Sequence, residues 1–327
     1  MKYILVTGYS GYIGSHICKE LHKQGYGVIG VDRVEPDDFD LYARYVDHQI
    51  ECEFSDASIL RILKQYNVDT VIHCAATSLV GPSVKDPDTY YRNNVDEMHV
   101  FLNLCRDAGI KRIVYSSSAA TYGDGHALFT ESIVNNPISP YGRTKMIGEW
   151  MIEDYCRAYG MSAVALRYFN VCGADFGVEF GQRGKPSHII AVSMIRAING
   201  ESITINGDGF GTEDGTCERD YIHVVDVARA NVAAVTADVD VFAAVNIGSG
   251  VGYSNLQIVE AINKYTKYLL PFNVGPGRAG DPARLVCNNS LAQQILNWEP
   301  LHSDLETIIT TAEKWHEKQI KGESNYA

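Results

Sequence analysis

Residues 3–14 read YILVTGYSGYIG, a short apolar run followed by three glycines spaced three residues apart. The apolar run 3–7 predicts a buried strand, and the periodic segment 12–24 behind it predicts a helix. In such a strand–turn–helix unit Gly8 permits the sharp turn, Gly11 lets the backbone approach a pyrophosphate, and Gly14 allows close packing of helix on strand. The spacing is GxxGxxG rather than the GxGxxG of the common dinucleotide fingerprint. For the glycines alone, a tight turn without a ligand therefore stays open as an alternative.

The second predicted strand, 28–32, ends in an acid that bears on the choice of cofactor. Asp32 lies about 20 residues beyond the glycines, where a carboxylate accepts hydrogen bonds from the adenosine ribose hydroxyls. Because that carboxylate repels a 2′-phosphate, the sequence favours NAD over NADP, and the neighbouring Arg33 weakens this preference without reversing it. Asp56 follows the third predicted strand and is either an adenine contact or the N-cap of the next helix.

Strands and helices alternate through the rest of the first half. Further strands are predicted at 50–54, 70–75, 112–116 and 163–168, and helices at 57–66, 88–108 and 141–159. This alternation is typical of an α/β fold with a doubly wound parallel sheet of the Rossmann type. Further along, the pattern changes to Gly-rich loops at 173–187 and 206–217. We therefore predict a dinucleotide-binding domain of residues 1–170, with a returning segment near 221–247, and a smaller, loop-rich α/β substrate domain of residues 171–327.

The composition excludes several classes of protein. The chain has 327 residues, 46% hydrophobic and 21% charged, a globular balance that argues against disorder. Its net charge is −12 with no basic block, so neither nucleic acid nor a membrane surface is an expected partner. No apolar stretch approaches the roughly 18 residues of a membrane span, and the first residues have no signal-peptide layout. Eight cysteines without a CxxC pair favour reduced thiols in a cytoplasmic protein. The ten histidines form no ligand cluster, so no metal is expected.

A second pattern suggests proton transfer. Tyr141 and Lys145 are four residues apart on a predicted helix, so that phenol and ammonium can converge on one ligand. A free phenol has a pKa of about 10, but a lysine and the positive charge of an oxidised nicotinamide both favour the phenolate. The pair follows a strand that ends in three serines, 116–118, at the sheet edge where ligands bind. Taken alone, a YxxxK pair is as well explained by the start of a surface helix.

Five segments together resemble the extended short-chain dehydrogenase/reductase family, and within it the nucleotide-sugar 4-epimerases: residues 7–16, 116–123, 139–145, 166–170 and 219–226. The similarity runs over essentially the whole chain. It implies epimerisation at C4 of a UDP-hexose, UDP-glucose or UDP-galactose, by transient hydride transfer to bound NAD. It further implies that Tyr141 is the acid/base, that Lys145 orients the nicotinamide ribose, and that Ser118 bonds to the 4-oxygen of the sugar.

The same resemblance implies two sets of binding residues. Residues implied at the NAD site are Gly8, Gly11, Tyr12, Ile13, Gly14, Asp32, Asp56, Ala75, Ala76, Asn93, Ser116, Tyr141, Lys145 and Tyr168. Residues implied at the UDP-sugar site are Ser118, Tyr141, Asn170, His188, Ile189, Arg219, Tyr221, Arg278, Asp281 and Leu285. Arginines suit a diphosphate because they are planar, bidentate donors, although each could instead form a surface ion pair. His223 is more simply a structural residue at a strand end.

Position 285 resembles the family's gate beside the 2-substituent of the sugar. A leucine there is intermediate in size, so we expect UDP-glucose and UDP-galactose as the main pair and weaker activity on the N-acetyl pair. The chain departs from the family in three places. Tyr9 must point away from the pyrophosphate, Ser78 stands where some relatives carry a lysine, and Glu218 puts an acid near the diphosphate.

Other activities stay open at this point. A UDP-N-acetylhexosamine or UDP-pentose 4-epimerase would use the same residues. A nucleotide-sugar dehydratase or decarboxylase needs an acid beside the active-site hydroxyl, whereas Ser118 is followed by Ala119 and Ala120, which cannot transfer a proton. A non-catalytic nucleotide-sugar sensor has no need of Tyr141, Lys145 and Ser118 together.

The resemblance also implies a homodimer built from helices 88–108 and 141–159 of each subunit. An apolar stripe on the first of these, from Tyr91 to Cys105, is wide enough to cover the sheet and also meet a partner helix. A helix buried only within its own chain explains that stripe equally well.

Overall fold

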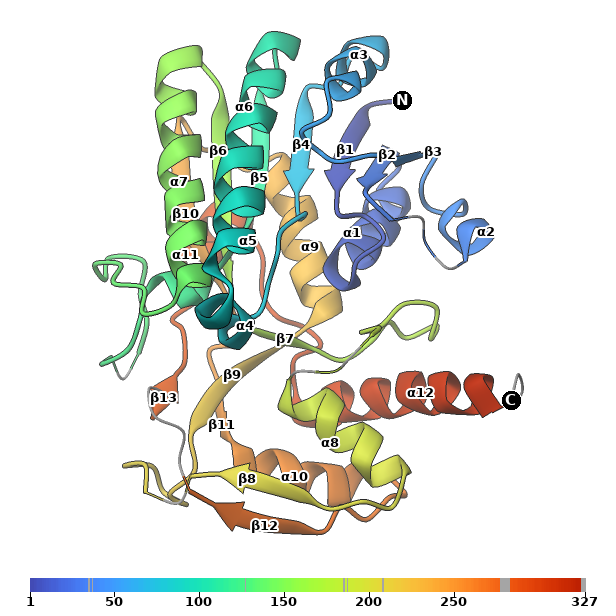
Figure 1. Cartoon of the computed structure of the whole chain (residues 1–327), viewed down its shortest axis with the longest axis vertical. Coiled ribbons are helices and arrows are strands. Elements are labelled where there is room, and N and C mark those ends of the chain that lie inside the picture. The colour runs from blue at the N-terminus through green and yellow to red at the C-terminus, as the bar shows by residue number, and fades with distance from the viewer. Residues whose placement is uncertain are drawn as a thin grey trace.

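A large parallel sheet, covered by helices on both faces, stands above a smaller α/β region (Figure 1). The computed structural model describes residues 1–34, 36, 38–126, 128–184, 186, 188–207, 209–276 and 283–324. None of the helices in these ranges has the length and apolarity needed to cross a membrane. All eight cysteines are free thiols, and six of them are buried.

The large sheet has seven strands, all parallel, in the order β10-β6-β5-β4-β1-β2-β3. Their bounds are β1 Tyr3–Thr7, β2 Gly27–Asp32, β3 His48–Glu51, β4 Thr70–His73, β5 Arg112–Ser118, β6 Ser162–Tyr168 and β10 Phe242–Ile247. From β1 the chain moves outward to β2 and β3, then crosses over to β4 on the other side, which opens a crevice at the carboxyl ends of these strands. This order confirms the doubly wound, Rossmann-type sheet. The third strand differs from its predicted position, 50–54.

Two helical layers cover the sheet, because successive strand residues point to opposite faces. Helices α1 (Tyr12–Lys23), α9 (Val224–Val235) and α11 (Ser290–Leu296) pack on the face to which Ile4 and Val6 point. The other layer consists of α3 (Ser58–Gln65), α6 (Glu97–Ala108) and α7 (Pro140–Tyr159), which pack on the face to which Leu5 points. Shorter elements are α2 Phe39–Tyr42, α4 Val80–Lys85, α5 Pro87–Tyr91, the π-helix η1 Arg92–Asp96 and the 3₁₀-helix η2 Ala119–Thr121.

The helix predicted at 88–108 is confirmed as a continuous helical run, 87–108, with a π-turn inside it that the sequence did not predict. The chain forms α5, the π-turn η1 and α6 in succession. A π-turn adds a residue to the helical ring and is frequent at functional sites. Here it turns Asn94 inward, where the side chain is buried.

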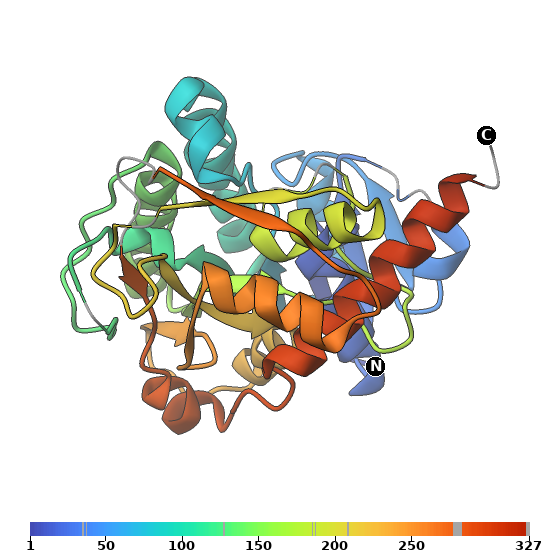
Figure 2. The same ribbon diagram turned by 90° about the horizontal axis from the view of Figure 1, so that it is seen from below.

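The smaller region is built around β9 (Glu218–His223). Strands β7 (Asn170–Cys172) and β13 (Arg284–Leu285) pair with it in parallel, and β11 (Gly252–Ser254) pairs antiparallel. A separate pair is formed by β8 Ile203–Asn206 and β12 Phe272–Gly275, and the helices are α8 Ile189–Ile198, α10 Asn255–Tyr265 and α12 Leu305–Ser324. These helices share one apolar core; Figure 2 shows them from below, α8 in yellow, α10 in orange and α12 in red.

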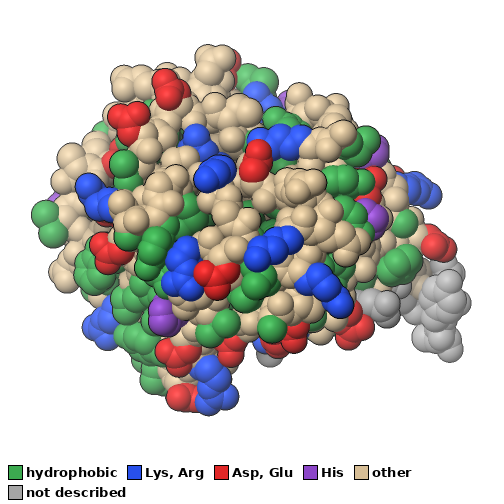
Figure 3. Space-filling view, turned by 90° about the horizontal axis from the view of Figure 1, so that it is seen from above, with side chains coloured by type: hydrophobic (Ala, Val, Ile, Leu, Met, Phe, Trp, Pro, Cys, Tyr) green, Lys and Arg blue, Asp and Glu red, His purple; other side chains and the backbone are tan. Residues whose placement is uncertain are grey.

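The described part of the surface shows no large basic patch on the face seen from above, in agreement with the absence of a basic block in the sequence. On the face seen from above, Lys and Arg side chains are interspersed with Asp and Glu (Figure 3). Among the described residues, no group of three or more His, Cys, Asp and Glu side chains is placed to hold a metal ion.

Candidate active site

The glycine turn after β1 is packed so closely that side chains do not fit. Gly8 has φ of +70°, and a Cβ on it would lie 2.8 Å from the backbone nitrogen of Ala75, just beyond β4. A Cβ on Gly14 would lie 2.1 Å from the carbonyl oxygen of Gly8. The turn therefore brings the ends of β1 and β4 and the start of α1 together, at the crevice where the strand order reverses.

The N-terminus of α1 suits a pyrophosphate. Gly11 is its N-cap residue and offers no side-chain oxygen, so the N–H groups of Tyr12 and Ile13 have no intrahelical acceptor and face an anion favourably. Asp32 ends β2 beside this turn, where its carboxylate accepts hydrogen bonds from the backbone N–H (3.2 Å) and the hydroxyl (2.7 Å) of Ser10. These groups fit a dinucleotide with a free ribose 2′-hydroxyl.

Tyr9, as expected, points away from this turn. Its ring lies under Gly30, where a Cβ would be 2.4 Å from the ring, and its hydroxyl donates to Gln49 at 3.1 Å. The side chain is only 2% exposed. The bulky residue in the glycine loop thus belongs to the core and leaves the phosphate side of the turn clear.

Helix α7 presents the tyrosine and the lysine at its first two turns. Ser139 caps the helix by accepting a hydrogen bond from the N–H of Gly142 at 3.1 Å, and Pro140 occupies the first turn. A Cβ on Gly142 would lie 2.3 Å from the carbonyl oxygen of Ala120, so glycine lets α7 approach the segment after Ser118. This approach places Tyr141 beside Ser118.

Lys145 joins this pair from one turn further along α7. Its ammonium donates to the carbonyl oxygen of Ser116 at 2.7 Å and lies 5.9 Å from the centre of the Tyr141 ring. The phenol of Tyr141 also interacts with the hydroxyl of Ser118. Three side chains from two elements thus converge at the carboxyl edge of β5.

Burial sets the protonation of these groups. It raises the pKa of Tyr141 to about 12, with Ser118 opposing and Tyr90 adding to the shift. Burial likewise lowers the pKa of Lys145 to about 8, against the effects of Cys74 and Glu149. At neutral pH Tyr141 is therefore a proton donor, and it becomes a base only when further positive charge, such as an oxidised nicotinamide, lies beside it.

Other residues implied at the cofactor site lie around this crevice. Ala75 and Ala76 are half-buried just beyond β4, and the amide of Asn93 donates to Asn94 at 3.2 Å. Ser116 and Tyr168 are joined through their hydroxyls at 3.1 Å. Asp56, by contrast, is exposed and accepts from the backbone N–H of Ser58 at 2.7 Å. The N-cap residue of α3 is Ala57, so Asp56 stands one residue before the cap and its side chain closes a turn onto the first residue of the helix.

The residues implied at the nucleotide side come together around β9. Arg219 is flanked in register by Tyr253 of β11 and Leu285 of β13. The amide of Asn170 donates to the carbonyl oxygen of Asp220 at 3.0 Å. Tyr221 is buried, whereas His188 and Ile189 stand at the start of α8, the histidine exposed. His223 ends β9 and is buried, and Arg278 and Asp281 lie outside the described residues.

Residues 4–248 match the NAD dependent epimerase/dehydratase family. The chain belongs to this family. It is 41% identical to the UDP-glucose 4-epimerase of Lactobacillus helveticus, over 98% of each chain. The UDP-glucose 4-epimerase of Brucella ovis, solved with NAD, has a TM-score of 0.91 and 40% identity, over 96% of this chain and 98% of that one. The UDP-glucose-4-epimerase of Stenotrophomonas maltophila, solved with NAD and formylated UDP-arabinopyranose, has a TM-score of 0.93 and 33% identity, over 98% and 100%.

Membership of this NAD-dependent family confirms NAD as the predicted cofactor and confirms the resemblance to the nucleotide-sugar epimerases. The roles assigned to individual residues stay predictions. Sequence reasoning missed Asn94, whose amide donates to the carbonyl oxygen of Thr77 (2.9 Å) and to the hydroxyl of Thr144 (3.0 Å) and accepts from the N–H of Thr77 (2.8 Å). It therefore ties the loop after β4 to the helix that carries Tyr141 and Lys145. A polar residue in a helical stretch was the only signal in the sequence.

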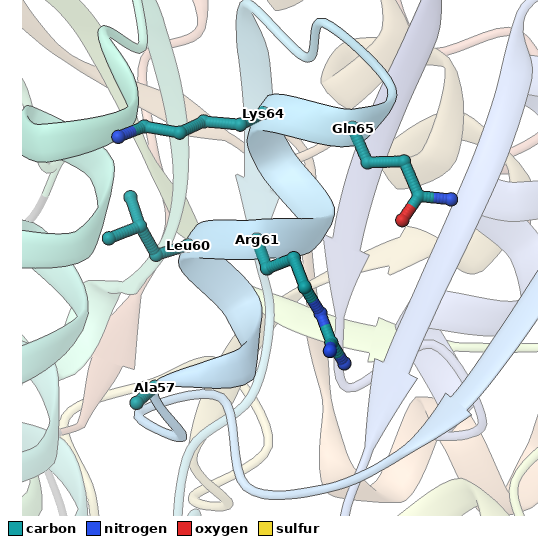
Figure 4. A pocket seen from close by; sticks show the side chains of 5 residues that line it. All are labelled: Ala57, Leu60, Arg61, Lys64 and Gln65. Atoms are coloured by element: carbon teal, nitrogen blue, oxygen red, sulfur yellow. The ribbon is translucent and has the colours of Figure 1, made fainter.

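A hollow on the outer side of α3 lies apart from all of these groups. It is lined by Ala57, Leu60, Arg61, Lys64 and Gln65 (Figure 4). Arg61 and Lys64 supply cations, but the hollow contains none of the residues that the sequence assigns to cofactor or sugar.

Proposed function

We propose that this chain interconverts UDP-glucose and UDP-galactose by epimerisation at C4, with NAD as its bound cofactor. The convergence of Tyr141, Lys145 and Ser118 beside a glycine turn fit for a dinucleotide carries this proposal. Family membership and the names of the similar proteins support it. Proton transfer at a secondary alcohol requires an acid/base group, a cation that stabilises its charged form and a hydrogen-bond partner for the oxygen, and Tyr141, Lys145 and Ser118 supply these three groups.

The protein's part in the reaction follows from this arrangement. The glycine turn and Asp32 would hold NAD, which would supply a reversible hydride acceptor for C4 of the sugar. Tyr141 accepts the proton of the 4-hydroxyl and gives it back, Lys145 stabilises the phenolate, and Ser118 holds the 4-oxygen. Because one site serves both epimers, the hexose must be held loosely and the diphosphate firmly, the task of Arg219 and Arg278.

The segment after Ser118 argues against net elimination. A dehydratase or decarboxylase needs an acid there, and the chain has Ala119 and Ala120, of which Ala119 is buried. The sugar that fits is limited by Leu285, which is half-buried and packs against a cluster containing Ala119, Tyr122 and Phe129. We infer weaker activity on the UDP-N-acetylhexosamines, since an acetamido group must displace this wall.

We also propose a cytoplasmic homodimer formed through α6 and α7. Part of the apolar stripe is buried in the subunit's own core, namely Met98, Leu102 and Cys105. The large apolar side chains that remain exposed on these helices are Val100 (44%), Trp150 (54%) and Tyr159 (49%), and two such helix pairs would form a four-helix bundle. A monomeric mass in light scattering at micromolar concentration would contradict the dimer.

The test of the activity is a turnover assay with UDP-galactose, run in parallel with UDP-N-acetylgalactosamine and a UDP-pentose. The proposal expects UDP-glucose as the product, with no net change in NAD. Tight binding of UDP-galactose without turnover would indicate the sensor, and loss of water from it would indicate the dehydratase. A UDP-hexuronic acid is assayed alongside, because carbon dioxide released from that substrate would indicate the decarboxylase.

A further inference from the structure

Buried polar contacts run from the catalytic helix into the sheet beneath it. Glu149 lies one turn beyond Lys145 on α7 and is 3% exposed. Its two carboxylate oxygens accept hydrogen bonds from Arg167 of β6, at 3.0 Å from Nε and 2.6 Å from Nη2. The hydroxyl of Ser117, next to Ser118, donates to the same carboxylate at 2.5 Å. Glu149 therefore ties α7, which carries Lys145, to β5, which carries Ser118, and to β6.

The contacts continue through Tyr122. The guanidinium of Arg167 lies 4.7 Å from the centre of the Tyr122 ring, which is 1% exposed. The Tyr122 hydroxyl donates to the side-chain oxygen of Asn246, at 2.7 Å. Asn246 belongs to β10 and is fully buried, so it loses a hydrogen bond outright if this partner is removed.

Asn246 extends the contacts to the wall of the sugar site. Its amide nitrogen donates to the carbonyl oxygen of Phe129 at 3.1 Å. The backbone of Phe129 is in turn bonded to the segment that follows β13: its N–H donates to the carbonyl oxygen of Val286 and its carbonyl oxygen accepts from the N–H of Asn288, both at 2.8 Å. The Asn246 amide thus joins Tyr122 to Phe129. Leu285 is linked to this amide through Val286, the next residue, which bonds to Phe129.

We propose that Tyr122 and Asn246 are positioning residues that set the distance between Leu285 and the catalytic serine, and so govern which sugar the site admits. The inference rests on the proposed function. Buried polar groups hold a single geometry because any other arrangement leaves one of them unpaired. Without the Tyr122 hydroxyl, Asn246 is held only by its remaining bonds, so Phe129 and the segment after Leu285 are fixed less firmly and the wall can shift outward while β13 keeps its pairing with β9. That shift makes room at the 2-substituent.

The test is Tyr122→Phe, which removes one hydroxyl and keeps the buried ring. We expect the ratio of kcat/KM for UDP-N-acetylgalactosamine over UDP-galactose to rise about three- to tenfold, the effect of losing a hydroxyl that bonds to Asn246 and also interacts with Arg167. The change should lie in KM, with kcat for UDP-galactose within about twofold of native, because no group that touches the reacting atoms is altered. Tyr268→Phe is the matched control, since its hydroxyl bonds to Glu317 in the smaller region.

A double-mutant cycle separates positioning from general loosening. Leu285→Ala opens the wall directly, so adding Tyr122→Phe should leave the ratio unchanged. A native ratio in Tyr122→Phe alone, or an equal shift in the Leu285→Ala background, overturns the inference.

The same ratio measured as dissociation constants by calorimetry needs no turnover. If the protein shows no epimerase activity, the proposed function is refuted. The dissociation constants still decide whether Tyr122 and Asn246 have the positioning role.

Discussion

The glycine turn of the proposed cofactor site is one contiguous stretch, whereas the proposed sugar side is assembled from segments far apart in the chain. On the cofactor side, we expect backbone groups between Gly8 and Gly14 to face the pyrophosphate, and neither Gly8 nor Gly14 has room for a Cβ. On the sugar side, Phe129, Asn246 and Leu285 meet only through tertiary contacts. A site made of backbone can be recognised from local spacing, but a site made of remote side chains cannot.

The two sides should also respond differently to substitution. The glycine turn admits no added atom without a shift of backbone, so changes there act on cofactor binding as a whole. Leu285 is half-buried at the end of a short strand, where a larger or smaller side chain can be accommodated. Changes on the sugar side should therefore alter selectivity more than turnover.

The largest effect is expected where the two sides meet, at Tyr141. Tyr141→Phe should preserve the fold and bound NAD and lower kcat about 10²–10⁴-fold, because the proton carrier is lost. Tyr155→Phe, on the same helix with its hydroxyl on Asn103, is the control. Near-native turnover of Tyr141→Phe in a steady-state assay would show that another group moves the proton.

The cofactor side is broken most directly at Gly14. Gly14→Ala places a Cβ 2.1 Å from the Gly8 carbonyl oxygen, so the turn must move, and NAD affinity should fall about 10²-fold. NAD content and calorimetric affinity measure this effect. Gly322→Ala is the control, because its Cβ would meet nothing within 4 Å. Native NAD affinity in Gly14→Ala would refute the tight-turn account.

On the sugar side, Leu285→Tyr should change selectivity and leave NAD binding as it is. A phenol in this wall costs the acetamido sugar about 1–3 kcal/mol of overpacking, which lowers its relative kcat/KM about 5- to 150-fold. The measurement is the ratio for UDP-galactose over UDP-N-acetylgalactosamine, which should rise. A ratio equal to native, or a native preference for the acetamido sugar, would contradict the assignment of Leu285.

The smallest expected effect is the pH dependence of stability, to which each of the two regions contributes a buried histidine. Burial lowers the pKa of His16 on α1 and of His223 on β9 to about 4. The unfolded chain, with a histidine pKa of about 6.5, then binds protons first, so stability is lost as pH falls from about 6.5 to 4. Thermal midpoints should drop by several degrees over this range.

His16→Gln tests which region sets that slope. Glutamine keeps a polar side chain and does not titrate, so the midpoint should vary less with pH if α1 contributes. A midpoint that is flat with pH in the native protein would exclude both histidines.

Sequence periodicity predicted most of the sheet because burial of a strand or helix face is a local pattern. The strand at 3–7 is predicted to the residue, whereas the strand at 50–54 lies at His48–Glu51. The π-turn η1 was missed, since apolar spacing says nothing about a turn held by Asn94 and its partners on Thr77 and Thr144.

The sequence by itself determined the doubly wound sheet, through its alternation of strands and helices, and it predicted the glycine turn and the pair Tyr141 and Lys145 from spacing within a few residues. Only the tertiary structure decided that the 88–108 stripe faces the subunit's own core and that Tyr122 and Asn246 connect the catalytic helix to the Leu285 strand. The physical reason is the reach of the interactions. Backbone conformation is governed by near neighbours, whereas a buried hydrogen bond has a partner that only the packed fold brings within 3 Å or so.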